Sequence, residues 1–130
     1  MFRPTSFKLV LAGFLLTVLV GSGLVQAREA RASNLLTTIT VAELPRPGAQ
    51  IYGLIHQGGP FAHDQDGRVF GNRERLLPNE KRGYYREYTV ASPDSRDRGV
   101  RRIVCGGPAK VPDNCFYTGD HYASFRRIVP

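Results

Sequence analysis

The chain changes its hydrophobic pattern twice along its length. Residues 9–20, LVLAGFLLTVLV, are almost entirely apolar and follow the basic start MFRPTSFK. The stretch LVQA then has small residues at the −3 and −1 positions of a cleavage site after Ala27. This order predicts a secretory signal peptide over residues 1–27, and hence a secreted, extracellular protein. An uncleaved membrane anchor is the weaker alternative, because a spanning helix needs about 20 apolar residues.

A helical pattern follows farther along the chain, after residue 44. Prolines precede apolar positions at Ile51, Leu54 and Ile55, and paired glycines follow them. This spacing predicts one short amphipathic helix from about Gly48 to Gln57. His56 lies near its end, where we interpret it as a residue that interacts with the helix dipole rather than as a catalytic group.

Downstream of the helix, runs of strand-forming residues are short and separated by turn signals. The turns DQDG, KRG and SPDSRDRG precede RVFGNRERLLP, YYREYTV and VRRIVCGG, and FYTGDHYASFRRIV closes the chain. Such close spacing leaves no room for crossover helices, so we expect an antiparallel sheet. The predicted class is α+β, with one N-terminal α-helix packed on one face of a small twisted antiparallel β-sheet.

The same pattern divides the chain into a leader, a short extension and one domain. Residues 28–43 begin polar and continue into β-branched residues, which predicts an N-terminal extension with a possible short strand. Residues 44–130 then form a single domain that is large enough for one modest core.

The charge of the chain favours a partner that carries phosphate. Without Arg3 and Lys8 of the leader, the net charge falls from +7 to +5, and arginine strongly outnumbers lysine. Guanidinium groups bind phosphate through paired donors, which a lysine cannot do. A generically basic secreted protein is the alternative that charge alone leaves open.

The two cysteines point to a disulfide rather than to a metal site. Cys105 and Cys115 both follow the leader, and export would place them in an oxidising compartment. The residues between them, GGPAKVPDN, are typical of a loop that one bridge closes. We expect no metal and no cofactor, because the chain has no other cysteine and its three histidines are scattered.

The candidate chemistry starts with a carboxylate in a predicted strand. Alternation in YYREYTV places Tyr85, Glu87 and Thr89 on one face, turned away from the helix. Arg98 and Arg102 are an even number of residues apart in the next predicted strand, so both guanidinium groups would share a face that can meet Glu87. Taken alone, this pattern is more typical of a structural ion pair between strands than of a catalytic base.

His121 changes this interpretation. It lies in TGDHYASF, where a turn at Gly119 and Asp120 precedes an expected strand start, so it would stand at a sheet edge next to a loop. A carboxylate, two arginines and an imidazole supply a base, two anion clamps and an acid. This set suits RNA cleavage by internal transesterification, in which the ribose 2′-hydroxyl attacks the adjacent phosphorus and no metal is required.

Four separate motifs also carry a family resemblance. In order and spacing, RVFGNRERLLP, RGYYREYTV, RDRGVRRIVCG and YTGDHYASF resemble the microbial guanyl-specific ribonucleases, and most of all their small secreted bacterial members, the relatives of barnase. The resemblance covers about Leu44 to Ile128. It implies the microbial ribonuclease fold, with cleavage of single-stranded RNA after guanosine through a 2′,3′-cyclic phosphate to a 3′-phosphate.

The resemblance implies a role for each residue of the catalytic set. Glu87 would be the general base of the first step and His121 the general acid, and the two would exchange roles when water opens the cyclic phosphate. Arg98 and Arg102 would hold the scissile phosphate, and Tyr122 would contribute a hydroxyl to it.

The FGNRE stretch would form the guanine pocket in this family. The base would lie between Phe70 and Arg73, with backbone amides around Gly71, Asn72 and Arg73 facing its acceptors. Glu74 would accept from the N1 and N2 hydrogens, because guanine has two adjacent donors on its Watson–Crick edge and a carboxylate accepts two parallel hydrogen bonds. Without the resemblance, Glu74 would be interpreted as a surface residue of a charge cluster.

The chain also departs from the family pattern. Arg86 stands beside the proposed base where a close relative can carry histidine, and no cysteine lies near either end to form the family's terminal disulfide. The bridge between Cys105 and Cys115 is therefore predicted from the two cysteines and the loop between them, and not from the family pattern. The insertion PAKVPDN before the final strands can alter access to His121.

Partners and alternative functions follow from the same interpretation. We expect a monomer that binds single-stranded RNA and has no stable membrane association after signal cleavage. A barstar-like acidic inhibitor is a further partner that the resemblance suggests, as for an antibacterial toxin ribonuclease. The other alternative is a secreted basic protein that binds RNA or another polyanion without turnover.

Overall fold

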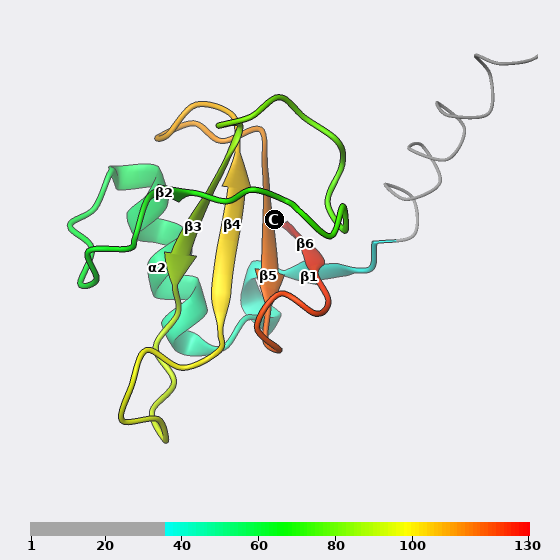
Figure 1. Cartoon of the computed structure of the whole chain (residues 1–130). Coiled ribbons are helices and arrows are strands. Elements are labelled where there is room, and N and C mark those ends of the chain that lie inside the picture. The colour runs from blue at the N-terminus through cyan, green and yellow to red at the C-terminus, as the bar shows by residue number, and fades with distance from the viewer. Residues whose placement is uncertain (1–35) are drawn as a thin grey trace, which may run out of the picture.

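In the computed structural model, which describes residues 36–130, a helix packs against one face of a six-stranded sheet (Figure 1). The structure thus has the predicted α+β class. The predicted signal peptide lies outside the described residues. Within residues 36–130, no helix has the length and apolar character that crossing a membrane requires.

Helix α2 (Arg46–Gln57) confirms the predicted helix and begins two residues earlier than expected. Proline is tolerated in the first turn, where the backbone amides lack partners within the helix, so Pro47 does not delay the start. The helix ends at Gly58, whose φ of 86° needs a residue without a Cβ atom. His56 lies in the last turn, as expected, and its Nδ1 is 2.9 Å from the Tyr52 carbonyl oxygen.

The sheet contains β1 to β6 in the order β1-β6-β5-β4-β3-β2. Strands β2 to β6 pair in antiparallel fashion, as the sequence predicts. The bounds of the six strands are Thr38–Thr40, Arg68–Val69, Tyr85–Thr89, Arg102–Gly106, Asn114–Thr118 and Arg126–Val129.

Strand β1 makes the sheet mixed, which corrects the prediction of a wholly antiparallel sheet. It pairs parallel to β6, with Ile39 opposite Ile128. A parallel neighbour needs a long connection, and the whole domain lies between these two strands along the chain. The strand expected within residues 28–43 is therefore present, and because Ile39 is buried in the core the folded unit begins before residue 44.

The turn after β1 is a short 3-10 helix, η1 (Val41–Glu43). Thr40 and Glu43 form a capping box, in which each side chain accepts a hydrogen bond from the backbone amide of the other. This cap directs the chain from the sheet edge into α2.

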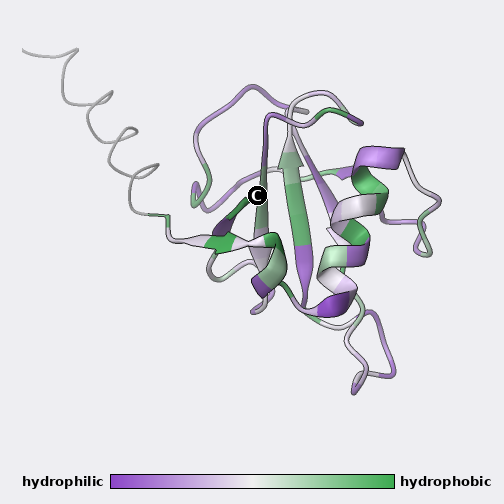
Figure 2. Ribbon diagram, turned by 180° about the vertical axis from the view of Figure 1, so that it is seen from behind, coloured by the Kyte–Doolittle hydropathy of each residue, from purple (hydrophilic) through white to green (hydrophobic). Residues whose placement is uncertain are grey.

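The core is divided by the sheet into two layers. On the helix side, Ile55 packs with Tyr88, Ile103 and the two cysteines. Figure 2, seen from behind, shows α2 on this side and the mostly hydrophobic central strand β4. On the opposite side, Leu77, Tyr85, Val104, Phe116 and Phe125 form a second cluster. The loops that follow β2 and β5 contribute Leu77 and Phe125, so this second layer fixes the loops that carry the candidate site.

The predicted disulfide between Cys105 and Cys115 is present and buried. The two residues are direct neighbours in the register of β4 and β5, and their Cα atoms are 4.1 Å apart. The bridge lies on the helix side of the sheet, and residues 107–113 form the loop that joins the two strands.

Three predicted strands are shorter in the structure. Strand β2 ends at Val69, so most of RVFGNRERLLP is loop. Strand β4 begins at Arg102, because Gly99 turns the chain with a φ of 68°. The YASF stretch is also a turn rather than a strand start, and β6 begins only at Arg126.

Candidate active site

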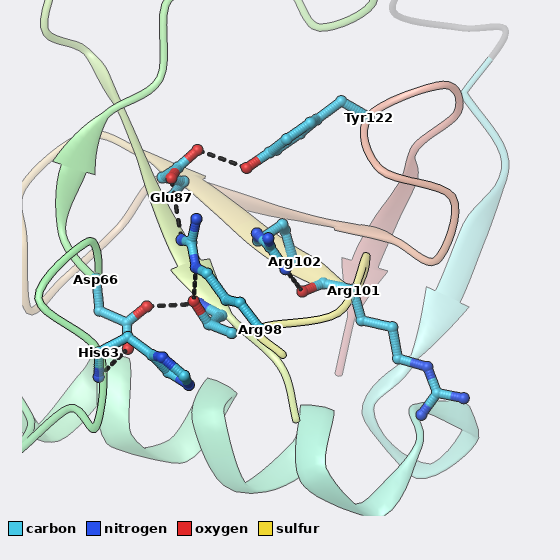
Figure 3. Close-up of polar contacts among 8 residues, drawn as sticks. His63, Asp66, Glu87, Arg98, Arg101, Arg102 and Tyr122 are labelled. Atoms are coloured by element: carbon cyan, nitrogen blue, oxygen red, sulfur yellow. Dashed lines mark hydrogen bonds and ion pairs between the residues drawn. The ribbon is translucent and has the colours of Figure 1, made fainter. Parts of the chain in front are cut away.

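Glu87 lies in the middle of β3, on the face turned away from the helix, as alternation predicts. The residue opposite Glu87 in the neighbouring strand β4 is Val104, which belongs to the core layer of that face. Both carboxylate oxygens accept hydrogen bonds: Oε1 from Arg98 Nη2 at 3.1 Å and Oε2 from the Tyr122 hydroxyl at 2.6 Å (Figure 3). The side chain remains 16% exposed, so the carboxylate is held firmly but is still open to the surface.

Arg98 reaches Glu87 by a route that the sequence did not predict. It lies in the loop before β4, so the expected alternation with Arg102 along one strand is wrong. Its Nε donates to Thr89 Oγ1 at 2.7 Å, and this second contact fixes the guanidinium beside the carboxylate. The predicted ion pair is thus confirmed, although a turn at Gly99 produces it.

Arg102 is the most buried charged residue of the site, with 3% of its surface exposed. It lies opposite Thr89 in the sheet, on the Glu87 face, and its guanidinium carbon is 6.0 Å from the centre of the Tyr122 ring. Nη1 donates to the Arg101 carbonyl oxygen at 2.7 Å. Nε has no hydrogen-bond partner within residues 36–130, which is costly for a buried cation.

His121 lies in the loop after β5 rather than at the start of a strand. Its side chain is exposed, and its backbone amide donates to the Val100 carbonyl oxygen at 3.1 Å. This bond ties the histidine loop to the loop that carries Arg98. The side chain lines two adjoining hollows, one shared with Glu87 and the other with Arg98.

The hollow shared with Glu87 has a volume of about 560 Å³ and brings most of the predicted site residues together. The five predicted guanine-binding residues of FGNRE all line it, next to the proposed base and acid. Arg98 and Arg102 are not among its lining residues. These are Val69, Phe70, Gly71, Asn72, Arg73, Glu74, Leu76, Glu87, His121, Tyr122, Ala123 and Phe125.

The Asn72 side chain shapes the loop that forms one wall of this hollow. Its Oδ1 accepts from the Leu77 amide at 3.1 Å, and its Nδ2 donates to the Leu77 carbonyl oxygen at 3.0 Å. Asparagine also tolerates the left-handed backbone observed here, with a φ of 49°. The loop therefore curls around buried Leu77, which presents Gly71, Arg73 and Glu74 to the hollow.

Tyr122 closes the space between the base pocket and Glu87. Its ring stacks on Phe70 with 5.2 Å between ring centres and 24° between ring planes. Burial, together with the hydrogen bond to Glu87, raises the pKa of Tyr122 to about 12. The hydroxyl is therefore a hydrogen-bond donor at neutral pH.

Sequence reasoning missed two residues that hold the site in shape. Thr89 orients Arg98, and Asp66 supports the end of β3 by accepting a hydrogen bond from the Thr89 amide at 2.7 Å. Asp66 belongs to the DQDG stretch, which the sequence pattern indicated only as a turn. The signal that could have indicated this role is an acidic residue in a turn that precedes the strand with the candidate base.

The residues that the structure describes contain no cluster of three or more His, Cys, Asp and Glu side chains placed to hold a metal ion. The site is instead a carboxylate, two arginines, an imidazole and a phenol around a hollow that can accept a planar ring. This arrangement can move protons and neutralise an anion.

Comparison with known proteins links this geometry to one family. A family model described as ribonuclease matches residues 26–129. The chain is 48% identical over 91 residues to guanyl-specific ribonuclease St of Saccharopolyspora erythraea, covering 70% of this chain and 86% of the relative. It is 46% identical over 91 residues to guanyl-specific ribonuclease Sa of Kitasatospora aureofaciens, covering 70% of this chain and 92% of that protein.

Solved structures of ribonuclease Sa2 share the fold. A complex of that protein with mononucleotides matches with a TM-score of 0.68 and 41% identity, covering 73% of this chain and 95% of Sa2. A structure of Sa2 with guanosine-2′-cyclophosphate matches with a TM-score of 0.66 and 40% identity, covering 73% of this chain and 97% of Sa2.

Proposed function

Because the chain belongs to the family of microbial guanyl-specific ribonucleases, we propose that it is an endoribonuclease that cleaves single-stranded RNA after guanosine. The first step forms a 2′,3′-cyclic phosphate, and water then opens it to a 3′-phosphate. One observation carries the proposal: Glu87, His121 and the Phe70–Glu74 loop line the same hollow. A base pocket and a proton-transfer pair thus share a single nucleotide-sized space.

In the first step, Glu87 removes the proton of the ribose 2′-hydroxyl. The 2′-oxygen forms a bond to phosphorus, the bond to the 5′-oxygen breaks, and His121 gives that oxygen a proton. In the second step, His121 takes a proton from water and the water oxygen forms a bond to phosphorus. The bond between phosphorus and the 2′-oxygen breaks, and Glu87 returns its proton to that oxygen. Glu87 is suited to the base role because it lines the hollow and two hydrogen bonds fix the direction of its carboxylate.

Arg98, Arg102 and Tyr122 stabilise the charge on the phosphate. The unpartnered Nε of buried Arg102 supports this assignment, since a phosphate would supply the missing negative charge to its guanidinium. The Tyr122 hydroxyl donates to Glu87 in the free protein and would turn to a phosphate oxygen when the substrate enters. That exchange would release one carboxylate oxygen of Glu87 for proton transfer.

The FGNRE loop recognises the base. The Phe70 ring offers a stacking surface, and exposed Glu74 lines the same hollow, where its carboxylate can accept both donors of the guanine edge. The backbone from Gly71 to Arg73 faces this space because the Asn72 side chain holds the loop in its curled form.

Export and partners also form part of the proposal. The leader pattern of residues 1–27 supports secretion to the extracellular space, where single-stranded RNA is the substrate and the chain acts as a monomer. The arginines beside the hollow would attract an acidic inhibitor of the barstar type. Measuring ribonuclease activity at increasing concentrations of such an inhibitor tests this partner. Unchanged activity would rule out the inhibitor as a partner.

Cleavage of a defined RNA in the presence of a metal chelator tests the central proposal. The purified protein should produce fragments that end in guanosine 3′-phosphate, with guanosine 2′,3′-cyclic phosphate ends at early times. Binding without cleavage would favour the polyanion-binding alternative, and cuts spread evenly over the four bases would show that the pocket has another role.

A further inference from the structure

The proposed acid, His121, and its neighbour Tyr122 share an unusual backbone conformation. Their φ angles are 54° and 70°, in the left-handed region that side chains with a Cβ atom rarely adopt. Two such residues in succession persist only where the surrounding structure holds them in place. The neighbouring residues of the loop provide that hold.

Thr118, Asp120 and Ser124 form a closed set of hydrogen bonds around the two residues, here called the 118–124 clamp. The Thr118 hydroxyl donates to Asp120 Oδ1 at 2.8 Å and accepts from the Tyr122 amide at 3.1 Å. Asp120 Oδ1 also accepts from the Ser124 amide at 2.9 Å, and Asp120 Oδ2 accepts from the Ser124 hydroxyl. The carboxylate therefore joins the start and the end of the loop.

The clamp is anchored in the sheet. Thr118 is the last residue of β5, is 1% exposed and lies directly opposite Arg102. The hydrogen bonds from Ser124 and Thr118 lower the pKa of Asp120, so the carboxylate stays ionised through the neutral range. The imidazole of His121 takes no part in the clamp, and it makes no hydrogen bond within residues 36–130.

We propose that Thr118, Asp120 and Ser124 are positioning residues of the reaction, which hold His121 and Tyr122 where the departing oxygen and the phosphate will lie. The inference rests on the proposed function. A general acid must come within about 2.6–3.2 Å of the oxygen that it protonates. The exposed imidazole of His121 has no hydrogen bond within residues 36–130 to hold it there, and the ring that it contacts, 4.9 Å away between ring centres, is that of Tyr122. The backbone clamp supplies the missing restraint, because fixing the Cα–Cβ direction restricts the space that the imidazole can sample.

The test compares two leaving groups. In a guanylyl dinucleotide, the departing 5′-oxygen needs a proton from His121. In guanosine 3′-(4-nitrophenyl phosphate), the 2′-oxygen displaces 4-nitrophenolate, which leaves with its electron pair as a stable anion and needs no acid. A defect in the placement of His121 should therefore appear with the first substrate and largely disappear with the second.

Thr118→Val is the main variant, since it keeps the shape of the buried side chain and removes all three hydrogen bonds of the hydroxyl, one to the Asp120 carboxylate and one from each of the Asp120 and Tyr122 amides. We expect kcat for the dinucleotide to fall about 10-fold or more, by analogy with other misplaced catalytic groups, while KM changes less than about twofold. With the aryl ester, the decrease in kcat caused by Thr118→Val should not exceed the decrease caused by Tyr122→Phe. This substrate needs no acid, so only the placement of the Tyr122 phenol still affects its rate. His121→Gln should show the same dependence on the leaving group.

Asp120 supplies a second variant pair if Thr118→Val impairs folding. Asp120→Asn retains an acceptor and a donor of the same shape, so kcat should stay close to that of the original protein, whereas Asp120→Ala should repeat the selective loss. Glu43→Gln is the matched control, because it weakens a carboxylate cap of the same kind in η1, away from the site. Both substrates should be cleaved normally by it.

Equal losses on both substrates beyond the effect of Tyr122→Phe, or unchanged activity in Thr118→Val and Asp120→Ala, would overturn the inference and leave the proposed function intact. If His121→Gln does not distinguish the leaving groups, His121 is not the acid, and both that part of the proposed function and this inference fail.

Discussion

At the scale of single residues, the two proposed proton-transfer groups, Glu87 and His121, differ in how firmly their side chains are held. Glu87 accepts hydrogen bonds from both Arg98 and Tyr122, whereas the side chain of His121 is exposed and makes no hydrogen bond within residues 36–130. This difference suits the two proposed roles. The base must remove a proton from one defined hydroxyl, and the acid must reach an oxygen that moves away as the bond breaks.

The first prediction concerns this pair. Glu87→Gln and His121→Gln should each reduce the rate of transesterification by about 10²-fold or more, the usual scale for a positioned base or acid. The rate should have a bell-shaped dependence on pH, because one group must be deprotonated and the other protonated. Stopped-flow or steady-state cleavage of a guanylyl dinucleotide measures both effects, and full activity in either variant would remove that residue from the mechanism.

The second prediction concerns the choice of base. Glu74→Ala removes the proposed acceptor of two guanine donors, so discrimination against other bases should fall by about 1–3 kcal/mol, on the scale of bidentate base recognition in duplexes. Slow, less selective cleavage should survive, because Glu87 and His121 are untouched. Inosine, which lacks the exocyclic amino group, should be a poorer substrate than guanosine for the original protein. Equal cleavage after guanosine and inosine would argue against the carboxylate contact.

At the scale of elements, the sheet separates stability from chemistry. Its helix face carries α2 and the disulfide, and its other face carries Glu87 and Arg102, with loops at the strand ends completing the hollow. The loop after β2 brings the base pocket, the loop before β4 brings Arg98, and the loop after β5 brings His121. Changes on the helix face should therefore alter unfolding more than catalysis.

The disulfide tests this separation. Closing the loop between Cys105 and Cys115 should stabilise the fold by about 2–3 kcal/mol through the loss of chain entropy in the unfolded state. Reduction and alkylation should lower Tm, measured by circular dichroism, while kcat at a temperature well below Tm changes little. The double variant Cys105→Ala/Cys115→Ala is the control and should be insensitive to reductant. A large decrease in kcat of the reduced protein, under conditions in which it is fully folded, would show that the bridge also shapes the site.

At the scale of the whole molecule, tyrosines occur in both core layers and in the site. Burial raises the pKa of Tyr84 and of Tyr122 to about 12, and it also raises the pKa of Tyr85 and of Tyr88. In the unfolded chain these phenols titrate near pH 10. The folded state therefore keeps protons that the unfolded state loses, and this contribution to stability is complete below pH 10.

The last prediction is the alkaline limit of the fold. As pH rises from about 10 to about 12, the unfolded state gains more from ionisation, so the free energy of unfolding should fall. Urea unfolding at a series of pH values measures this slope. Tyr122→Phe should make the fall shallower, because it removes one of the shifted phenols. An identical slope in this variant would mean that Tyr122 does not contribute.

The sequence by itself determined the elements whose signals are local. Prolines and glycines bracket α2, the period of two assigns the face of Glu87, and two cysteines in a chain with a predicted export signal indicate one bridge. The four motifs also pointed to every residue of FGNRE and to both proposed proton-transfer residues. These features could be predicted because each depends on residues that are close together in the chain or on a recognisable pattern.

The tertiary structure alone decided the features that depend on distant contacts. Strand β1 pairs in parallel with β6, the last strand of the chain. Arg98 meets Glu87 through a turn at Gly99 rather than through alternation along a strand. His121 stands in a left-handed turn, and its backbone amide donates to the carbonyl oxygen of Val100, in a distant loop, although its own stretch favours the start of a strand in the sequence pattern. Local propensity for strand or turn is weak, and hydrogen bonds across a folded sheet override it.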